Sequence, residues 1–458
     1  MAQAASTMHA YLGELQDVEH PVQSYFPEGA IVKLPIICLP DIVLFPGDDL
    51  PLRMLSDTNI ESIRDQLGSE GAVLGIICPY QQGDIAYGTT VRIEKFRVVD
   101  RCAAVTGAAK QRFRVRADTQ QHVHSSFVEV EILPHLRAPR MPFSNRQHKT
   151  QRAHDGNSPA KSQAGAYSRH KQQGVQALSS RRLRDQQFVG YWGRHAYALF
   201  DVHLLIRRIQ GMFESSTHWT WFSKASNALS QQQQHHHTAD TAQQGSILHY
   251  LMQPSEMQDP SIFAYWVAGN LPLDRQERLE LLQIDCIVRL LRKEIEILGK
   301  FGDDIYCSGC GSFLAHMRDI FSMTSHGAAG TFVNPGGNVF QVLTLREIHQ
   351  DHVVIDVDRS TQDSWFPGFS WSIVHCGSCY RHLGWQFDRV GVHDGGLGHS
   401  PTRFFGFRRA ALTQSFSGRR YAVGDSESED AEDGYDDNDE VESLVSSVDY
   451  ESDDNGVD

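Results

Sequence analysis

The chain has 458 residues and a formal net charge of −14 at pH 7, from 42 Lys and Arg against 56 Asp and Glu. Residues 425–458 hold sixteen of those acidic residues and no Lys or Arg, so the rest of the chain is close to neutral and a strongly basic nucleic-acid-binding body is disfavoured. No secretory signal opens the sequence, its apolar runs are far shorter than the roughly eighteen residues of a membrane span, and eight cysteines are too few for a disulfide scaffold. These features predict a soluble intracellular protein with reduced thiols.

Residues 31–133 are rich in short apolar and β-branched runs. Turn signals such as Pro46-Gly47-Asp48 and Gln82-Gly83-Asp84 separate them. Because no helical period intervenes, the pattern predicts an antiparallel barrel or sandwich. The expected strands cover residues 31–38, 72–78, 89–98, 112–115 and 127–133.

Two polar inserts follow. Residues 137–187 contain eleven Lys and Arg against two acidic residues, and a Gln run followed by a His run covers residues 231–237. Neither insert has enough apolar surface to offset the entropy of ordering. Inserts at 137–187 and 224–245, together with the acidic tail, are therefore predicted to be disordered.

Helical periodicity appears around these inserts. Residues 191–213 show apolar side chains at helical spacing, and 275–298 is predicted as one continuous helix. Asp274 and Glu277 fit a capping box at its start, and Gly299 stands where a C′ glycine is expected at its end. The apolar stripe of this helix consists of Ile284, Ile287, Val288, Leu291, Ile295 and Leu298.

A second β-rich block, from 303 to about 412, contains the sharpest motif. Cys307 and Cys310 form one C-x-x-C pair and Cys376 and Cys379 form another, with 65 residues between them. Two such pairs supply the four thiolates of a closed tetrahedral zinc site, which leaves no position for a catalytic water. One structural Zn²⁺ is therefore predicted. Two unrelated redox or free pairs are the alternative, and the absence of a βαβ pattern around either pair disfavours it.

Three of the seven tryptophans lie in the same block. Trp385 and Phe387 are two residues apart, so both face the same side of a strand. A Pro-Gly turn between Trp365 and Trp371 can bring those two together. Three indoles at right angles would form a box for a small flat or cationic group. Composition alone leaves this box and an ordinary aromatic core equally open.

The C-terminal motifs resemble the CULT domain of the cereblon family. They occur in the family's order: Cys307-x-x-Cys310, Thr331-Phe332-Val333-Asn334-Pro335, Ser364-Trp365-Phe366-Pro367-Gly368-Phe369-Ser370-Trp371, Cys376-x-x-Cys379 and Gly384-Trp385-x-Phe387.

The N-terminal half resembles the Lon N-terminal-like domain of the same family. Its matching pieces are Tyr11-Leu12-Gly13, Leu44-Phe45-Pro46-Gly47, Tyr87-Gly88-Thr89-Thr90, Gln111-Arg112-Phe113-Arg114-Val115, Ile132-Leu133-Pro134 and the helical stretch 271–298. The fold expected from both resemblances is α+β and mostly β, in two domains. The implied division is an N-terminal extension at 1–30, a Lon-like domain at 31–300, a CULT domain at 302–412 and a disordered tail at 413–458.

The resemblance implies a substrate receptor of a cullin-4-type RING ubiquitin ligase, in the cytoplasm and nucleus. Residues 191–266 would dock on the DNA-damage-binding adaptor of that ligase. The box would bind cyclic imides such as glutarimides and so recruit proteins for ubiquitination and proteasomal degradation. Carried over by motif, its walls are Trp365, Trp371, Trp385 and Phe387, with Asn334 and Pro335 at the lip.

Three features depart from relatives in that family. Asp363 stands where vertebrate members have His, which places side-chain donation to the imide in doubt. Ile373 replaces a Val near the surface that meets recruited proteins. The basic insert and the Gln run suggest an invertebrate member.

Other functions remain for comparison. A methionine sulfoxide reductase of the B type would need a nucleophilic cysteine beside the zinc, but the remaining ones, Cys38, Cys78, Cys102 and Cys286, all lie in the first domain. A Lon protease would need a phosphate-binding G-x-x-x-x-G-K-[ST] loop, and the chain has none. A zinc-ribbon nucleic-acid-binding protein would need basic residues among the aromatics of the second block. The sequence therefore favours a non-catalytic receptor.

Overall fold

The computed structural model describes residues 9–18, 25–55, 60, 73–78, 85–99, 102–115, 127–138, 199–219, 259–323, 327–391 and 401–416. Of the basic insert and the acidic tail predicted above, only residues 137–138 and 413–416 are described. The polar insert at 224–245 and the turn at Gln82-Gly83-Asp84 lie outside the described residues. Among the described residues, no helix combines the length and apolar character needed to span a membrane.

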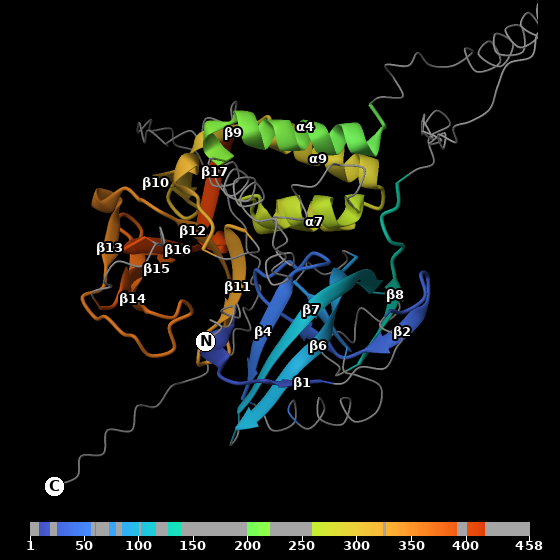
Figure 1. Ribbon diagram of the computed structural model, residues 1–458, viewed down its shortest axis with the longest axis horizontal. Helices are drawn as coiled ribbons and strands as arrows, with labels where there is room; N and C mark the ends of the chain where they lie inside the picture. Colours follow the sequence, from blue (N-terminus) through green and yellow to red (C-terminus); the bar gives the residue numbers. More distant parts are fainter. Residues whose placement is uncertain are drawn as a thin grey trace, which may run out of the picture. The chain divides into compact units, whose positions relative to one another are not determined.

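The N-terminal region, residues 9–300, is built on a sheet of eight strands (Figure 1). The strand order is β2-β8-β7-β6-β5-β3, while β1 pairs with β6 and β4 with β7. The predicted β-rich character of this region is confirmed. The strand pairs are antiparallel, as expected, except for β3–β5, which is parallel. The bounds are β1 Gln16–Asp17, β2 Ile31–Leu34, β3 Ile36–Cys38, β4 Asp49–Met54, β5 Val73–Ile77, β6 Tyr87–Val99, β7 Cys102–Val115 and β8 Val128–Ile132.

The single strand predicted at 31–38 is wrong. The chain breaks at Pro35 into β2 and β3, which lie at opposite ends of the sheet path. Proline has no N–H to donate to a strand ladder. Its carbonyl oxygen instead accepts from the N–H of Gly75 at 2.8 Å, which directs the following residues toward β5.

Four α-helices are described in the N-terminal region: α4 Val202–Ser215, α7 Pro260–Asn270, α8 Arg275–Gln283 and α9 Ile287–Leu298. Helices α4, α7 and α9 contact one another pairwise (Figure 1). The predicted capping box is confirmed: the Asp274 carboxylate accepts from the N–H of Glu277 at 2.8 Å, and the Glu277 side chain accepts from the N–H of Asp274 at 3.2 Å.

The continuous helix predicted at 275–298 is wrong, because it divides into α8 and α9. The buried guanidinium of Arg112 accounts for the break. It donates to the carbonyl oxygen of Leu282 at 2.9 Å and to that of Ile284 at 2.5 Å, so these carbonyls face β7 instead of continuing the helical ladder. Gly299 also differs from the prediction, since its φ of −75° is right-handed and not the left-handed conformation of a C′ glycine.

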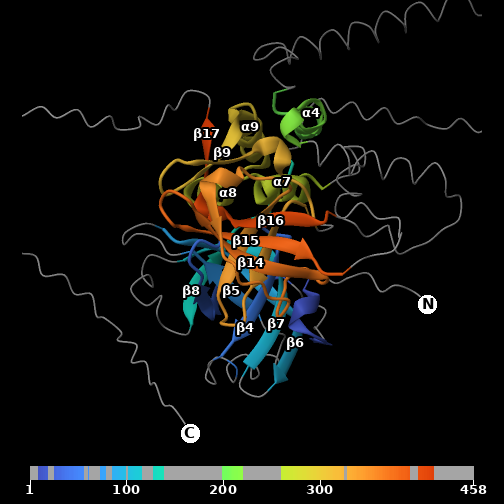
Figure 2. The same ribbon diagram turned by 90° about the vertical axis from the view of Figure 1, so that its left-hand side faces the viewer.

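The C-terminal region, residues 301–416, contains two described sheets. One has the order β10-β9-β17 and the other β11-β12-β16-β15-β14-β13; strands β14, β15 and β16 of the second are visible side by side in Figure 2. Strand β17 continues to Phe416, beyond the expected boundary at 412. The bounds are β9 Phe301–Cys307, β10 Phe313–His316, β11 Ala329–Val333, β12 Val339–Leu345, β13 Val353–Ile355, β14 Phe369–Cys376, β15 His382–Arg389, β16 Arg403–Arg408 and β17 Leu412–Phe416.

Buried arginines connect the two regions. Arg278 on α8 donates to the side chain of Gln341 on β12, and Arg409, which follows β16, donates to the carbonyl oxygen of Gly269 on α7 at 2.6 Å. Both guanidiniums are almost fully buried. A buried charge is costly without hydrogen-bond partners. These contacts therefore favour one position of the C-terminal region against the N-terminal region.

Candidate metal centre and aromatic site

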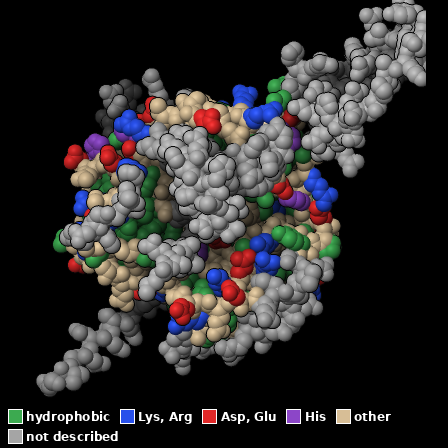
Figure 3. Space-filling model, viewed as in Figure 1, with side chains coloured by type: hydrophobic (Ala, Val, Ile, Leu, Met, Phe, Trp, Pro, Cys, Tyr) green, Lys and Arg blue, Asp and Glu red, His purple; other side chains and the backbone are tan. Residues whose placement is uncertain are grey.

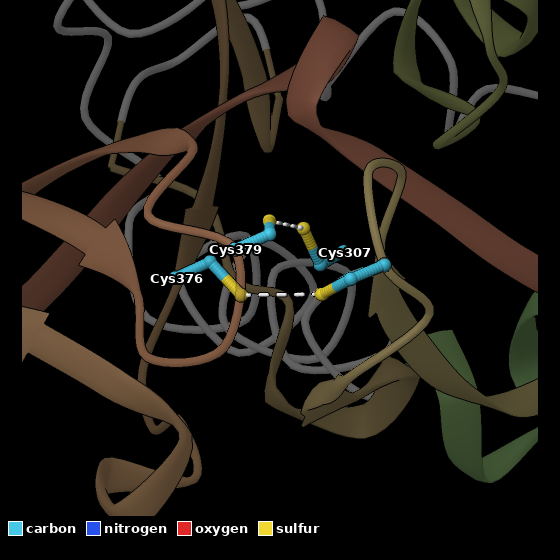
Figure 4. A group of neighbouring side chains, drawn as sticks. Cys307, Cys376 and Cys379 are labelled. Carbon is cyan, nitrogen blue, oxygen red and sulfur yellow. Dashed lines mark hydrogen bonds between the residues drawn. The ribbon is translucent and has the colours of Figure 1, made fainter.

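The four paired cysteines converge in space (Figure 4). The Sγ atoms of Cys307 and Cys379 are 3.6 Å apart, and those of Cys310 and Cys376 are 3.5 Å apart. All four sulfurs lie within 4.8 Å of one another. Four thiolates each bound at about 2.3 Å to a tetrahedral zinc would be about 3.8 Å apart. The cluster therefore has the size of a site that can hold a metal ion.

Two turns present these sulfurs. Cys307 ends β9 and its Sγ accepts from the N–H of Gly309 at 3.4 Å, while Cys376 ends β14 and the next residue, Gly377, donates its N–H to the carbonyl oxygen of His352 at 2.8 Å. Strand β9 belongs to the three-stranded sheet and β14 to the six-stranded sheet. A shared ion would join the two sheets of the C-terminal region.

Burial and hydrogen bonding shift the pKa values of two of these thiols in opposite directions. Burial raises the pKa of Cys307 to about 12. Burial opposes ionisation of Cys310 as well, but hydrogen bonds with Ser312 and with the neighbouring cysteines outweigh it and lower the pKa of Cys310 to about 6. Groups this close cannot all carry negative charge without a neighbouring cation.

Two of the predicted box walls contact each other directly. The rings of Trp365 and Trp385 are 4.5 Å apart between centroids and inclined by 69°, so they meet edge to face like two adjoining walls. Phe387 lies 6.5 Å from Trp365. Trp365 is 7% exposed and Trp385 is 9% exposed. These two indoles are therefore part of the core as well as candidate walls of a site.

Trp371 lies on the same sheet face as Trp385 and Phe387, and its side chain is more exposed than those of Trp365 and Trp385. It pairs with Phe387 across β14 and β15, and directly opposed residues of an antiparallel pair share a face. The Pro367-Gly368 turn expected between the tryptophans is present. The N–H of Phe369 donates to the carbonyl oxygen of Phe366 at 3.1 Å, and Gly368 has a φ of 84°. The indole N–H of Trp371 donates to the carbonyl oxygen of Gln362 at 2.8 Å.

The two residues predicted at the lip and Asp363 belong to two different loops. Asn334 and Pro335 form the tip of the β11–β12 hairpin, where the Asn334 side chain accepts from the N–H of Asn338 at 2.8 Å. Asp363 has a left-handed φ of 53° and pairs with Arg53 of β4 at 3.1 Å. Asp363 and Tyr11 both line a cavity of about 570 Å³.

Several aromatic neighbours were not predicted as site residues. Phe332 stacks on Trp365 at 5.1 Å with an angle of 17°, and Phe340 lies 5.2 Å from Trp385. Phe366 contacts Phe387 at 4.9 Å. Phe332 belongs to the hairpin motif noted in the sequence, whereas nothing in the local sequence distinguishes Phe340 from an ordinary strand residue.

The N-terminal region matches a known protein family. Residues 33–300 match the ATP-dependent protease La (LON) substrate-binding domain, which is more than half of the chain, so the chain belongs to the family of proteins that carry this domain. Among solved structures, the N-terminal domain of a Mycobacterium avium complex Lon protease aligns over 98% of its length with 58% of this chain, at 14% identity and a TM-score of 0.30.

The resemblance to cereblon is also confirmed. Cereblon from Danio rerio is 26% identical over 422 residues, which cover 89% of this chain and 86% of that protein. Cereblon from Xenopus tropicalis is 26% identical over 414 residues, covering 89% of this chain and 83% of that protein. Cereblon from Drosophila erecta is 31% identical over 174 residues, which cover 36% of this chain and 28% of that protein.

Proposed function

We propose that this chain is the substrate-recognition subunit of a cullin-4-type RING ubiquitin ligase and binds cyclic imides at its tryptophan site. The observation that supports this most directly is the corner formed by Trp365 and Trp385, with Trp371 on the same sheet face. The cereblon-like sequence motifs predict the aromatic box at these same tryptophans. Proteins that carry an imide, or that are recruited by a bound imide, would then be ubiquitinated and degraded.

A glutarimide has the properties that such a corner can recognise. Its methylenes would lie against the indole faces, and burying them removes apolar surface from water. Its N–H and carbonyls would be met by backbone groups of residues 363–365. Asp363 already pairs with Arg53, and a carboxylate donates no hydrogen bond. Its side chain therefore does not donate a hydrogen bond to the imide carbonyls. A ring without the imide leaves the buried backbone groups unpaired, which disfavours its binding.

The metal and the division of the chain complete this proposal. Cys307, Cys310, Cys376 and Cys379 would hold one Zn²⁺, whose closed tetrahedral coordination stabilises the fold and leaves no catalytic position. Residues 31–300 and 302–412 would act as the Lon-like and CULT domains of the receptor. The proposed site has no catalytic role, and we expect the protein in the cytoplasm and the nucleus.

The adaptor would dock on the helical part of residues 191–266. Among the described residues of this segment, Leu204 on α4 is 39% exposed and Leu199 just before it is 51% exposed. Apolar side chains on an outer helix face are the contacts that a groove in a partner protein covers. Lys and Arg side chains are interspersed with Asp and Glu on the described surface visible in Figure 3, which favours a protein partner over a nucleic acid.

Titration of the full chain with a plain glutarimide tests the proposal, with tryptophan fluorescence as the readout. We expect saturable quenching that an N-methylated imide does not produce. Trp385→Ala should abolish the response while zinc content stays at one per chain, and Tyr25→Ala, which removes an aromatic ring 58% exposed in the N-terminal region, should leave it unchanged. A folded, zinc-loaded chain that ignores both imides would refute imide recognition.

A further inference from the structure

Four residues outside the predicted box walls hold Trp365 in place. Its indole N–H donates to the carbonyl oxygen of Val333 at 3.0 Å, and the N–H of Val333 donates to the Tyr11 hydroxyl at 3.1 Å. The carbonyl oxygen of Tyr11 accepts from Arg53 at 3.4 Å, and Arg53 donates to Asp363 at 3.1 Å. Asp363 precedes Trp365 by two residues. These contacts, together with the backbone from Asp363 to Trp365, form a closed circuit.

This circuit crosses three parts of the chain. Tyr11 belongs to the N-terminal segment, Arg53 to β4 of the eight-stranded sheet, and Val333 to β11 of the C-terminal region. Ring contacts reinforce it, because Phe332 lies 6.4 Å from Tyr11 and stacks on Trp365. Trp365 is thus held at its indole N–H and at its ring face, and Asp363, two residues before it, is held by Arg53.

The ion pair of this circuit is partly shielded from water. The side chain of Arg53 is 14% exposed and that of Asp363 is 27% exposed, so their ion pair is screened much less than a surface pair. Burial raises the pKa of Tyr11 well above its usual range. The phenol accordingly stays protonated and its oxygen remains a neutral acceptor for the Val333 N–H.

The conformation of Asp363 requires this support. A φ of 53° is left-handed, a region that residues other than glycine enter at a cost unless surrounding contacts compensate. The β11–β12 hairpin also lies directly against β4, because a Cβ added to Gly337 would lie 2.9 Å from the backbone oxygen of Arg53. The same strand therefore contacts both loops that flank Trp365.

We infer that Tyr11 and Arg53 are positioning residues that set the orientation of Trp365 and, through it, the affinity of the tryptophan site. The ligand role of Trp365 rests on the proposed function, whereas the circuit itself does not. On this inference the N-terminal segment and β4 both affect ligand binding at the tryptophan site, although neither contributes one of its walls.

Hydrogen exchange of the Trp365 indole N–H tests the inference without any ligand. The full chain would carry ¹⁵N-labelled tryptophan, and Trp365→Phe would identify the resonance. Arg53→Met and Asp363→Asn should each accelerate this exchange by about tenfold, the effect of losing one partly buried ion pair. The double variant should be no faster than the faster single variant, because the two residues act as one unit. Arg53→Lys, which keeps the charge, should restore most of the protection.

The control is Arg114→Met, which removes an arginine that pairs with Glu131 at 2.8 Å in the same sheet but away from the circuit. It should leave the Trp365 exchange unchanged. Tyr11→Phe, which removes the acceptor of the Val333 N–H, should accelerate the exchange as Arg53→Met does. Unchanged exchange in Arg53→Met, Asp363→Asn and Tyr11→Phe would overturn the inference.

Imide titration of the same variants separates the two proposals. If the unaltered chain binds a glutarimide, Arg53→Met and Asp363→Asn should weaken binding by about tenfold in dissociation constant. Unchanged affinity despite faster exchange would overturn the link from Trp365 to the ligand. If no variant binds an imide, the proposed function fails, and the exchange rates alone decide whether Arg53 and Tyr11 position Trp365.

Discussion

The guanidinium of Arg409 donates to the carbonyl oxygen of Gly269 at 2.6 Å and also to that of Leu271. Both carbonyls lie at the C-terminal end of α7, where a helix leaves its last carbonyls without intrahelical partners. One arginine of the C-terminal region thus caps a helix of the N-terminal region. The contact joins two residues that are 140 positions apart in the sequence.

Removal of that guanidinium should destabilise the whole protein. Arg409→Met keeps much of the side-chain volume but leaves buried carbonyls unpaired, which costs about 3 kcal/mol of unfolding free energy. Urea unfolding followed by circular dichroism would measure it. Arg359→Met is the control, because Arg359 pairs with Asp388 at 3.0 Å but is 54% exposed, and we expect a change below about 0.5 kcal/mol there. Equal effects would contradict the capping role of Arg409.

Loss of one cysteine ligand should remove both the metal and the C-terminal fold. In Cys376→Ser the metal content should fall from one zinc per chain to none, and the melting temperature should fall with it, since metal binding and folding are coupled in such sites. Elemental analysis and thermal melting would show both effects. Cys102→Ser, outside the cluster, should change neither. A Cys376→Ser protein with one zinc and the native melting temperature would refute the assignment.

Replacement of Glu294 should stabilise the protein at neutral pH. Its side chain is fully buried on α9, and neither carboxylate oxygen has a hydrogen-bond partner among the residues that the structure describes. Desolvation therefore raises the pKa of Glu294 well above its usual value. Glu294→Leu removes that desolvation cost, and we expect an increase of about 2 kcal/mol at pH 7. Glu296→Leu on the exposed side of the same helix is the control and should not stabilise.

The pH dependence of this effect has a definite sign. The unfolded chain loses the Glu294 proton near pH 4.3, its ordinary pKa, while the folded chain keeps it to higher pH. Between those two values the folded state binds more protons, so its stability falls as pH rises. The advantage of Glu294→Leu should therefore be smaller at pH 4 than at pH 7. A constant or reversed difference in urea unfolding would exclude a raised pKa.

Two glycines with left-handed φ values separate steric clash from backbone strain. Gly384 begins the contact of β15 with β16 at a φ of 153°, and an added Cβ would lie 2.1 Å from the oxygen of Gly406. Gly391 has a φ of 90°, and no atom of the described part of the chain lies within 4 Å of such a Cβ. Gly391→Ala should cost about 1 kcal/mol, whereas Gly384→Ala should prevent the β15–β16 pairing and abolish soluble folded protein. Comparable expression and melting of the two variants would contradict the packing described.

The sequence alone determined some of the local elements of this protein. Alternation and turn residues predicted strands that overlap β5, β6, β8 and the end of β7, and Asp274 with Glu277 marked the start of α8, because these signals act over a few residues. Strands β1 and β4 were not predicted. The paired cysteines predicted their own convergence, since a C-x-x-C turn places two sulfurs on one side. Motif order was sufficient to identify the cereblon family.

Only the tertiary structure decided where distant polar groups meet. Arg112 breaks the helix at Ile284 and Arg53 holds Asp363, and in each case the partner lies more than 150 residues away. No local pattern reveals such a pair, because a buried arginine and an exposed one look alike in the sequence. The close packing of Trp365 on Trp385 was likewise decided by three-dimensional contacts, since both indoles had to be placed by strands and loops that meet only in the folded chain.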